Sequence, residues 1–231
     1  MKINDLKIED ISSRLMISVM NYENSKDIIS SYPHLHRGEF GIVSQICIGN
    51  KNEHGLYDGC LTVTNSHLDH WGISNEQLFE LAAMNTNNLF TPMYFPLNRF
   101  MDSNVGLDLK PHSGCVITNS SCWNGSSVLF GSDIFSGIYY TFDKEKEWAL
   151  LPMSDEIIAL RLSNYEIEDI VSIYDDIRVK CGGITENILF CDLSDELKPV
   201  FSSFNGEVLD TNLTFSDENV SDRPINAGRG M

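Results

Sequence analysis

The sequence GCLTVTNS at residues 59–66 returns almost unchanged as GCVITNS at residues 114–120. In each copy a short apolar run with β-branched residues ends at Thr-Asn-Ser. Such runs are typical of strands, whereas Thr, Asn and Ser favour helix starts and turns. The repeat therefore predicts two buried strands that each lead into a capped helix or turn. It also predicts that crossing segments join the strands, which gives the fold an α/β character.

Further strands are predicted on both sides of the first copy. The apolar run at 39–49 is followed by the polar turn at 51–55, so residues 39–49 and 59–64 are expected to form a hairpin. Residues 13–20 read as another strand, and a helix there is the alternative.

Two helices have clear boundaries in the sequence. Ser74 begins a Ser-x-x-Gln capping box, and apolar residues at three and four spacing follow it, which predicts a helix over 75–87. Residues 165–181 have an apolar stripe and an acidic opposite face, and Gly182 follows as a C-cap. Asp175 and Asp176 on that acidic face are interpreted as solvated surface charge.

The fold class predicted from these elements is α/β or α+β, in a single globular domain over residues 1–200. We expect a mixed sheet of about five or six strands with about three or four helices. Residues 201–231 are polar and are predicted to form a mobile C-terminal tail.

Composition indicates a soluble protein with a sizeable core. The chain has 231 residues, of which 42% are hydrophobic. No apolar run approaches the roughly 18 residues of a membrane span, and the first ten residues are polar. We therefore expect a cytoplasmic location without a signal peptide.

The net charge of −17 limits the classes of partner. Nucleic acids and anionic membranes both attract basic surfaces, so neither is expected to bind directly. Between residues 155 and 222 the chain has 16 acidic and 4 basic side chains. Plain solubility is the favoured explanation of this charge. If there is a protein partner, the imbalance favours a basic one.

The even number of cysteines does not by itself predict disulfides. In a reducing compartment, cysteines are expected to remain thiols. Cys47, Cys60, Cys115 and Cys191 lie in apolar, strand-like runs, where a thiol packs as a small hydrophobic group. Cys122 and Cys181 complete the set.

Histidine pairs are the first candidates for a metal site. His67 and His70 would share one helix face, but no third ligand follows at a recognisable spacing. His34 and His36 form a second pair with the same weakness. Neither pair predicts a metal or any other cofactor.

The remaining candidate residues are one histidine, one cysteine and two tryptophans. His112 and Cys115 have the residue types of a base and a nucleophile, although nothing nearby would orient the imidazole. Trp71 and Trp123 follow the two repeated strands and are interpreted as packing residues first and interface residues second. No Gly-rich phosphate loop follows a predicted strand.

Several short motifs occur in the order seen in an uncharacterised bacterial family. The chain resembles domain of unknown function family five-six-eight-eight over about residues 10–195, most specifically over residues 64–90. The motifs are NYE at 21–23, PH at 33–34, NSHL at 65–68, WGI at 71–73, LF at 78–79, NT at 85–86, LF at 89–90, TN at 118–119, NG at 124–125, LLPMS at 150–154 and II at 157–158.

This resemblance implies a soluble bacterial α/β domain without an assigned activity. It implies an origin in gut-dwelling Gram-positive bacteria, often near mobile elements. Family members usually carry a further N-terminal strand-and-helix segment, so the resemblance implies that this is a shortened member. The sequence after Val200 departs from the family pattern.

Three hypotheses about function follow. The absence of a specific catalytic motif favours a non-enzymatic, acidic interaction or regulatory module, including an accessory protein of a mobile element that acts on a protein partner. The first alternative is an enzyme with an unrecognised Cys/His or metal site. The second alternative is a small-ligand-binding domain.

Overall fold

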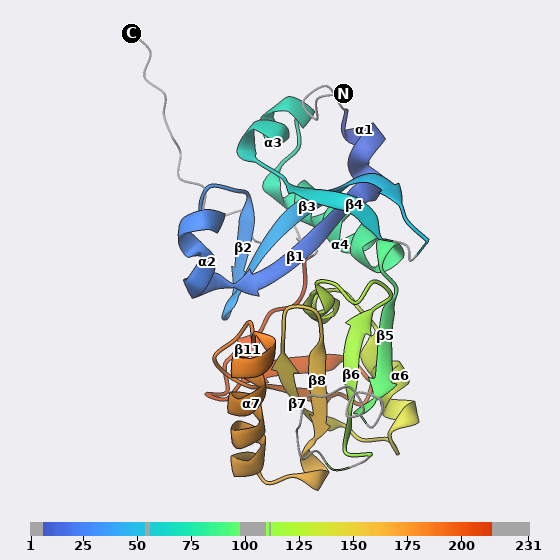
Figure 1. Cartoon of the computed structure of the whole chain (residues 1–231), viewed down its shortest axis with the longest axis vertical. Helices are drawn as coiled ribbons and strands as arrows, with labels where there is room; N and C mark the ends of the chain where they lie inside the picture. Colours follow the sequence, from blue (N-terminus) through green and yellow to red (C-terminus); the bar gives the residue numbers. More distant parts are fainter. Residues whose placement is uncertain (1–6, 54–55, 98–109, 111, 214–231) are drawn as a thin grey trace.

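Strand β3 (Phe40–Lys51) is the centre of the N-terminal sheet. The computed structural model describes residues 7–53, 56–97, 110 and 112–213 (Figure 1). Strand β1 (Leu15–Asn21) pairs with one side of β3, and β2 (His34–Arg37) and β4 (Tyr57–Thr62) share the other side. The β3–β4 pair is the predicted hairpin, and β1 confirms the strand reading of residues 13–20.

In the described part of the chain, four α-helices accompany this upper sheet. The predicted capping box is present, because Ser74 Oγ accepts a hydrogen bond from the Gln77 amide at 3.2 Å. In return, Gln77 Oε1 accepts one from the Ser74 amide at 2.9 Å. The helices are α1 (Ile8–Ile11), α2 (Tyr22–Ile29), α3 (Asn65–Trp71) and α4 (Asn75–Leu89), and a 3₁₀ turn covers Ser12–Arg14.

The second half of the chain forms a seven-stranded lower sheet (Figure 1). Its strand order is β11-β10-β9-β7-β8-β6-β5. The strands are β5 (Pro92–Pro96), β6 (Gly114–Asn119), β7 (Glu147–Pro152), β8 (Ile157–Arg161), β9 (Leu189–Leu193), β10 (Pro199–Ser203) and β11 (Val208–Leu209). Its helices are α6 (Ile134–Thr141) and α7 (Ile167–Cys181), with 3₁₀ turns at Gly125–Leu129 and Leu162–Asn164.

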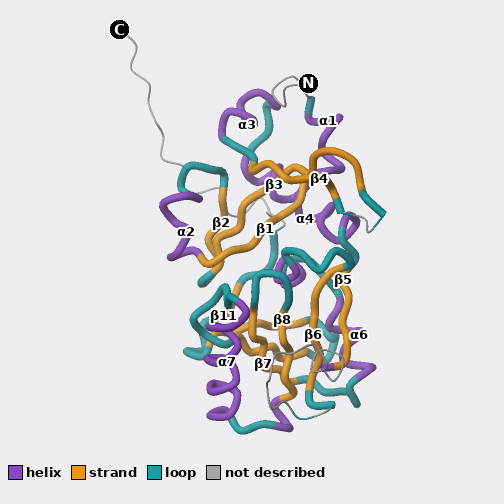
Figure 2. Tube along the Cα trace, in the orientation of Figure 1, coloured by secondary structure: helices purple, strands orange, loops and turns teal. Residues whose placement is uncertain are grey.

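The central strands of the lower sheet are buried on both faces. In β7, Trp148 and Leu150 belong to the main core, whereas Ala149 and Leu151 pack in a second cluster that includes residues of α7. Successive side chains of a strand point to opposite faces, so an unbroken apolar run fits a covered strand. Figure 2 shows α7 lying beside this sheet.

One cluster of buried side chains is common to the two sheets. It contains Ile17 and Phe40 from the upper sheet together with Leu150 and Ile157 from the lower sheet. At the junction, the rings of Phe40 and Phe130 meet edge to face with centroids 5.7 Å apart. The two halves therefore pack on each other through a continuous apolar interior.

The α+β alternative of the predicted fold class describes the structure, and the single mixed sheet was wrong. The described chain has a four-stranded and a seven-stranded sheet, and every pairing in them is antiparallel. The two repeated segments are strands as predicted, but β4 and β6 lie in different sheets. The described helices also exceed the three or four expected. The short helix predicted from Tyr22 is present, and residues 65–71, which directly follow the first repeated strand, form an additional one.

The chain stays packed beyond the predicted boundary at residue 200. β10 begins at Pro199, and Phe201, Leu209 and Leu213 are buried. Residues 214–231 of the predicted tail lie outside the described residues. No helix in the described ranges is both long and apolar enough to cross a membrane.

Asn124 ties the outer edge of β1 to the lower half of the molecule. Its side chain is buried, its Oδ1 accepts a hydrogen bond from the Val19 amide at 3.0 Å, and its Nδ2 donates one to the Ile17 carbonyl at 2.7 Å. The carboxamide thus bonds to β1 as a neighbouring strand would. Next to it, Thr86 Oγ1 accepts a hydrogen bond from the Ile17 amide at 3.0 Å.

The backbone at Asn124 is held in place from the other side. Its amide donates to Asp155 Oδ1 at 2.9 Å, in the turn between β7 and β8. Asn124 adopts the left-handed conformation with φ of 53°, which Asn tolerates better than most residues. A side chain at Gly125 would lie 1.9 Å from the Asp155 carbonyl oxygen, so this close approach needs glycine.

We predict that removing the Asn124 carboxamide destabilises the protein by about 2–5 kcal/mol, because two buried backbone groups of β1 lose their partner. Asn124→Gly is the informative variant, since glycine accepts the left-handed conformation. Chemical denaturation measures the effect. The matched control is Asn88→Ala, which removes an exposed amide that donates to Met84 O within α4 and should change stability by no more than about 0.5 kcal/mol. Equal stability of both variants would contradict the proposed role of Asn124.

Candidate functional site

His67 and His70 have different environments on α3. His67 is buried, its Nδ1 accepts a hydrogen bond from the Thr64 amide at 3.0 Å, and its ring stacks on Trp71 at 5.2 Å. Burial, followed by the nearby His70, lowers the pKa of His67. His70 is exposed. In this arrangement His67 caps the helix, and within the described ranges no three His, Cys, Asp or Glu side chains are grouped to hold a metal ion.

His112 and Cys115 differ in their exposure to solvent. His112 is exposed with φ of 62°, whereas Cys115 is completely buried in β6. Burial raises the pKa of the Cys115 thiol. A thiol that stays protonated and inaccessible is a poor nucleophile.

The two tryptophan candidates take part in packing. Trp71 is almost fully buried against the main core. Trp123 is half-buried, and its ring meets Phe90 edge to face at 6.3 Å. Trp123 packs against a small cluster outside the main core, which contains Met16, Cys47 and Phe90.

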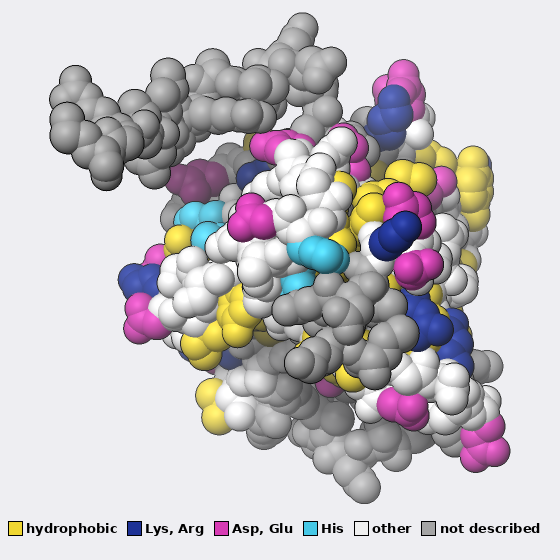
Figure 3. Space-filling model, turned by 90° about the horizontal axis from the view of Figure 1, so that it is seen from above, with side chains coloured by type: hydrophobic (Ala, Val, Ile, Leu, Met, Phe, Trp, Pro, Cys, Tyr) yellow, Lys and Arg dark blue, Asp and Glu magenta, His cyan; other side chains and the backbone are white. Residues whose placement is uncertain are grey.

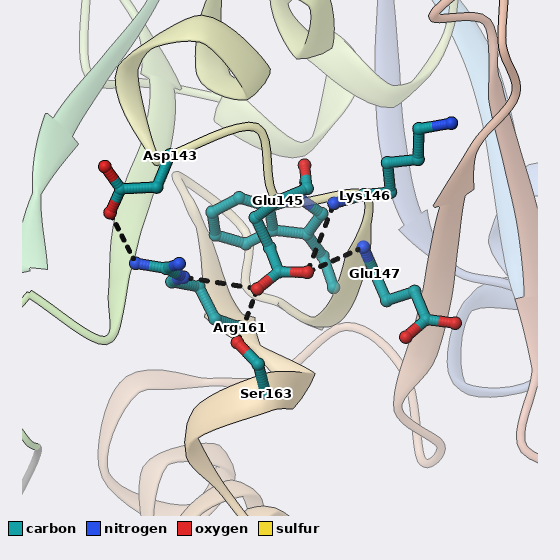
Figure 4. A network of polar contacts seen from close by, with 7 residues as sticks. Asp143, Glu145, Lys146, Glu147, Arg161 and Ser163 are labelled. Atoms are coloured by element: carbon teal, nitrogen blue, oxygen red, sulfur yellow. Dashed lines mark hydrogen bonds and ion pairs between the residues drawn. The ribbon is translucent and has the colours of Figure 1, made fainter.

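The turn between α6 and β7 contains a dense polar network (Figure 4). The Glu145 carboxylate is only 13% exposed and accepts hydrogen bonds from Arg161 Nε at 3.3 Å and from the Ser163 hydroxyl. Arg161 also donates to Asp143 at 3.4 Å. Because the charged groups of Asp143, Glu145 and Arg161 point at one another, we interpret the network as a clamp that holds the turn.

A recess lies where the two sheets meet. A hollow of about 610 Å³ separates the β2–β3 turn from β9, β10 and β11, and His36, Glu39, Asn187 and Glu207 contribute polar groups to it. Asn187 also lines a second hollow of about 260 Å³ beside α7. We call these adjoining hollows the Asn187 groove.

Glu39 connects the two walls of the groove. Its carboxylate accepts hydrogen bonds from the Glu186 amide and from the Asn187 side chain. These contacts join the β2–β3 turn to the segment that precedes β9. In β2, just before this turn, the His36 ring stacks on Tyr22 with centroids 3.6 Å apart.

The groove is acidic and partly apolar. Four carboxylates line it, and none of its described lining residues is Lys or Arg. Exposed apolar side chains lie among them, with Phe204 54% and Val208 72% exposed. The four carboxylates are those of Glu39, Asp175, Glu186 and Glu207.

The top of the upper sheet does not have this character. In Figure 3, acidic, basic and apolar side chains are interspersed on that face. The excess of acid predicted from the sequence is therefore not gathered there. At the groove, Arg178 balances part of the charge, because it contacts Asp175 at 3.5 Å.

Sequence reasoning did not select the groove residues. Glu39 and Asn187 are separated by 148 positions and have no motif in common. Asp175 was interpreted as surface charge on α7, and it is exposed. Only the acidic excess after residue 155 pointed toward this face of the molecule.

A family model described as a family of unknown function, DUF5688, matches residues 2–178. The chain belongs to this family. The matched region of this DUF5688 member includes the upper sheet and ends within α7, so β9, β10 and β11 lie beyond it. No curated protein and no solved structure matched the chain. The family membership therefore assigns no activity to the groove.

The Glu145 network predicts a pH-dependent contribution to stability. Burial raises the pKa of Glu145, but hydrogen bonds from Ser163, the Glu147 amide and Arg161 outweigh it and lower the pKa overall. A carboxyl with a lowered folded-state pKa stabilises the protein above its unfolded value of roughly 4.3, and this stabilisation is lost as the pH falls through the folded value. Glu145→Gln should cost roughly 1–3 kcal/mol near pH 7.

Denaturation of the parent and Glu145→Gln across acidic pH measures this difference. The stability gap between them should narrow as the pH falls. Glu147→Gln is the control, because Glu147 is exposed two residues away. A gap that stays constant with pH would show that the charge of Glu145 does not stabilise the turn.

Proposed function

We propose that the protein is a non-enzymatic interaction module that binds a basic, partly apolar segment of a partner protein in the Asn187 groove. The observation that carries the proposal is the lining of the groove. It combines four carboxylates with exposed apolar side chains and has no Lys or Arg among its described lining residues. Such a surface complements a segment with alternating cations and apolar groups.

The arrangement of the groove supports an extended segment. The two adjoining hollows meet at Asn187 and extend from the β2–β3 turn to α7. Phe204 and Val208 belong to the β10–β11 hairpin, where they are exposed and available for apolar contact. Exposed side chains of this size often mark binding surfaces when they lie together.

The setting that we propose for this interaction is the bacterial cytoplasm. The resemblance to a bacterial family described above supports this setting. An accessory role for a mobile element, acting on a basic host protein, belongs to the same proposal. Direct binding to nucleic acid is not expected, because a net charge of −17 repels phosphates.

Charge reversal in the groove tests the proposal. The probe is a short labelled peptide that alternates lysine and leucine, and its binding is measured by fluorescence anisotropy. The double variant Glu186→Lys/Glu207→Lys should weaken binding about tenfold, which corresponds to about 1.4 kcal/mol. A peptide with glutamate in place of lysine should not bind.

The matched control reverses two exposed carboxylates elsewhere, Glu9 in α1 and Asp133 beside α6. Glu9→Lys/Asp133→Lys has the same net charge as the groove variant but should bind the peptide nearly as well as the parent does. If both double variants weakened peptide binding equally, the affinity would depend only on the net charge of the protein. That result would contradict the proposal that the peptide binds in the groove.

A small ligand is the second candidate, because the hollow beside His36 falls within the usual range for such sites. A compound that binds there should raise the melting temperature of the parent. The same compound should have a much smaller effect on Glu207→Lys. A metabolite panel without any stabilising compound would leave the peptide as the better occupant.

A further inference from the structure

Cys47 and Cys60 face each other across the β3–β4 hairpin. They are directly opposite in the antiparallel register, and their Sγ atoms are 3.9 Å apart. Along the same ladder, the Val63 amide donates to the Ser44 carbonyl at 2.9 Å. Since bonded and non-bonded pairs alternate, Cys47 and Cys60 form a non-hydrogen-bonded pair, in which side chains lie closest.

A disulfide fits this position. Opposed residues of a non-hydrogen-bonded pair have a Cα separation of about 4.5 Å, within the range of roughly 4.4–6.8 Å that disulfides occupy. The sulfur atoms must approach to about 2.05 Å, which side-chain rotation and a small strand adjustment can provide. We propose that Cys47 and Cys60 form a redox-active dithiol that closes reversibly to a cross-strand disulfide.

The two thiols are not equivalent. Cys47 is completely buried, with its Sγ 3.5 Å from the Met16 Sδ, whereas Cys60 is half-buried and can be reached from solvent. The hydrogen bond to Cys60, followed by burial, raises the pKa of Cys47. The contact with Cys47 lowers the pKa of Cys60, the more accessible of the two thiols. Cys60 is therefore the attacking thiolate and Cys47 the resolving thiol.

Basic side chains lie close to the pair in this acidic protein. Arg14 and Lys51 both lie over the Tyr57 ring, at 5.8 and 5.2 Å from its centroid. Tyr57 packs in the same small cluster as Cys47 and Cys60. Nearby cations favour a thiolate and attract an anionic reaction partner.

The other described cysteines lack this arrangement. Cys115 and Cys191 are buried, and burial raises the pKa of both thiols. Cys122 is exposed on the turn after β6. Among the cysteines described with their side chains, only Cys47 and Cys60 have their sulfur atoms in contact.

The oxidant in this proposal is a low-molecular-weight disulfide. The Cys60 thiolate attacks one sulfur of that disulfide, so a mixed disulfide forms and one small thiolate leaves. In the mixed disulfide, Cys60 no longer holds a thiol that raises the pKa of Cys47, and Cys47 Sγ already lies against Cys60 Sγ. Unlike the enclosed Cys115, the Cys47 thiol can then give up its proton and attack Cys60 Sγ, which expels the second small thiolate. Overall, the two protein thiols are oxidised to one disulfide, and the small disulfide is reduced to two thiols.

The test uses the folded, full-length chain and oxidised glutathione, followed by intact mass measurement and peptide mapping without reduction. The parent should lose two hydrogen atoms, with Cys47 linked to Cys60, and dithiothreitol should restore them. Cys47→Ser should instead accumulate a glutathione adduct at Cys60, because no resolving thiol remains. Cys122→Ser is the control and should form the linkage as the parent does.

Alkylation of the parent gives a second measurement that needs no variant. Iodoacetamide at neutral pH should modify Cys60 at least about tenfold faster than Cys115 or Cys191, since it reacts with accessible thiolates. A stable glutathione adduct at Cys60 of the parent, or no Cys47–Cys60 linkage after exposure to the oxidant, would overturn the proposal.

Discussion

The structure depends on the way one buried carboxamide completes the edge of a strand. Strand β1 is the last strand on its side of the upper sheet, so its outer amides and carbonyls need partners. Asn124 supplies one donor and one acceptor to that edge, at Ile17 and Val19, and its own amide is anchored by Asp155. The Asn124 side chain therefore takes the place of a neighbouring strand and holds the two sheets in a fixed position relative to each other.

The groove is a consequence of that docking. With the sheets held together at β1, the β2–β3 turn lies opposite the segment before β9, where Glu39 bonds to Glu186 and Asn187. The recess between them gathers carboxylates that come from distant parts of the chain. The binding proposed at the groove and the redox chemistry proposed at the Cys47–Cys60 pair would use different parts of the molecule, so each proposal can be tested without the other.

Local features could be predicted from the sequence, and long-range ones could not. The Ser74 capping box and the apolar stripe of α7 depend on residues that are close together in the sequence. Both helices have nearly the predicted bounds. The pairing of β6 with β8 joins residues some forty positions apart, and no local signal selects that partner. Hence the β3–β4 hairpin was predicted from its local turn, whereas the number of sheets and the antiparallel pairings between distant strands were missed.

The same limit applies to the functional candidates. Asn124-Gly125 has the sequence of an ordinary turn, and its partners in β1 are more than a hundred residues away. The histidine and tryptophan candidates were chosen because their residue types are chemically versatile. In the fold, His67 and Trp71 stack on each other and Cys115 is enclosed in the core.

Native-state hydrogen exchange at the Val19 amide is the most direct test of the account. This amide lies on the outer edge of β1, and its described acceptor is the Asn124 side chain. The account predicts that it exchanges only through global unfolding, as slowly as the amides of the central strand β3. Fast exchange through local opening, as expected for an unpaired strand edge, would contradict the claim that Asn124 holds the two sheets together.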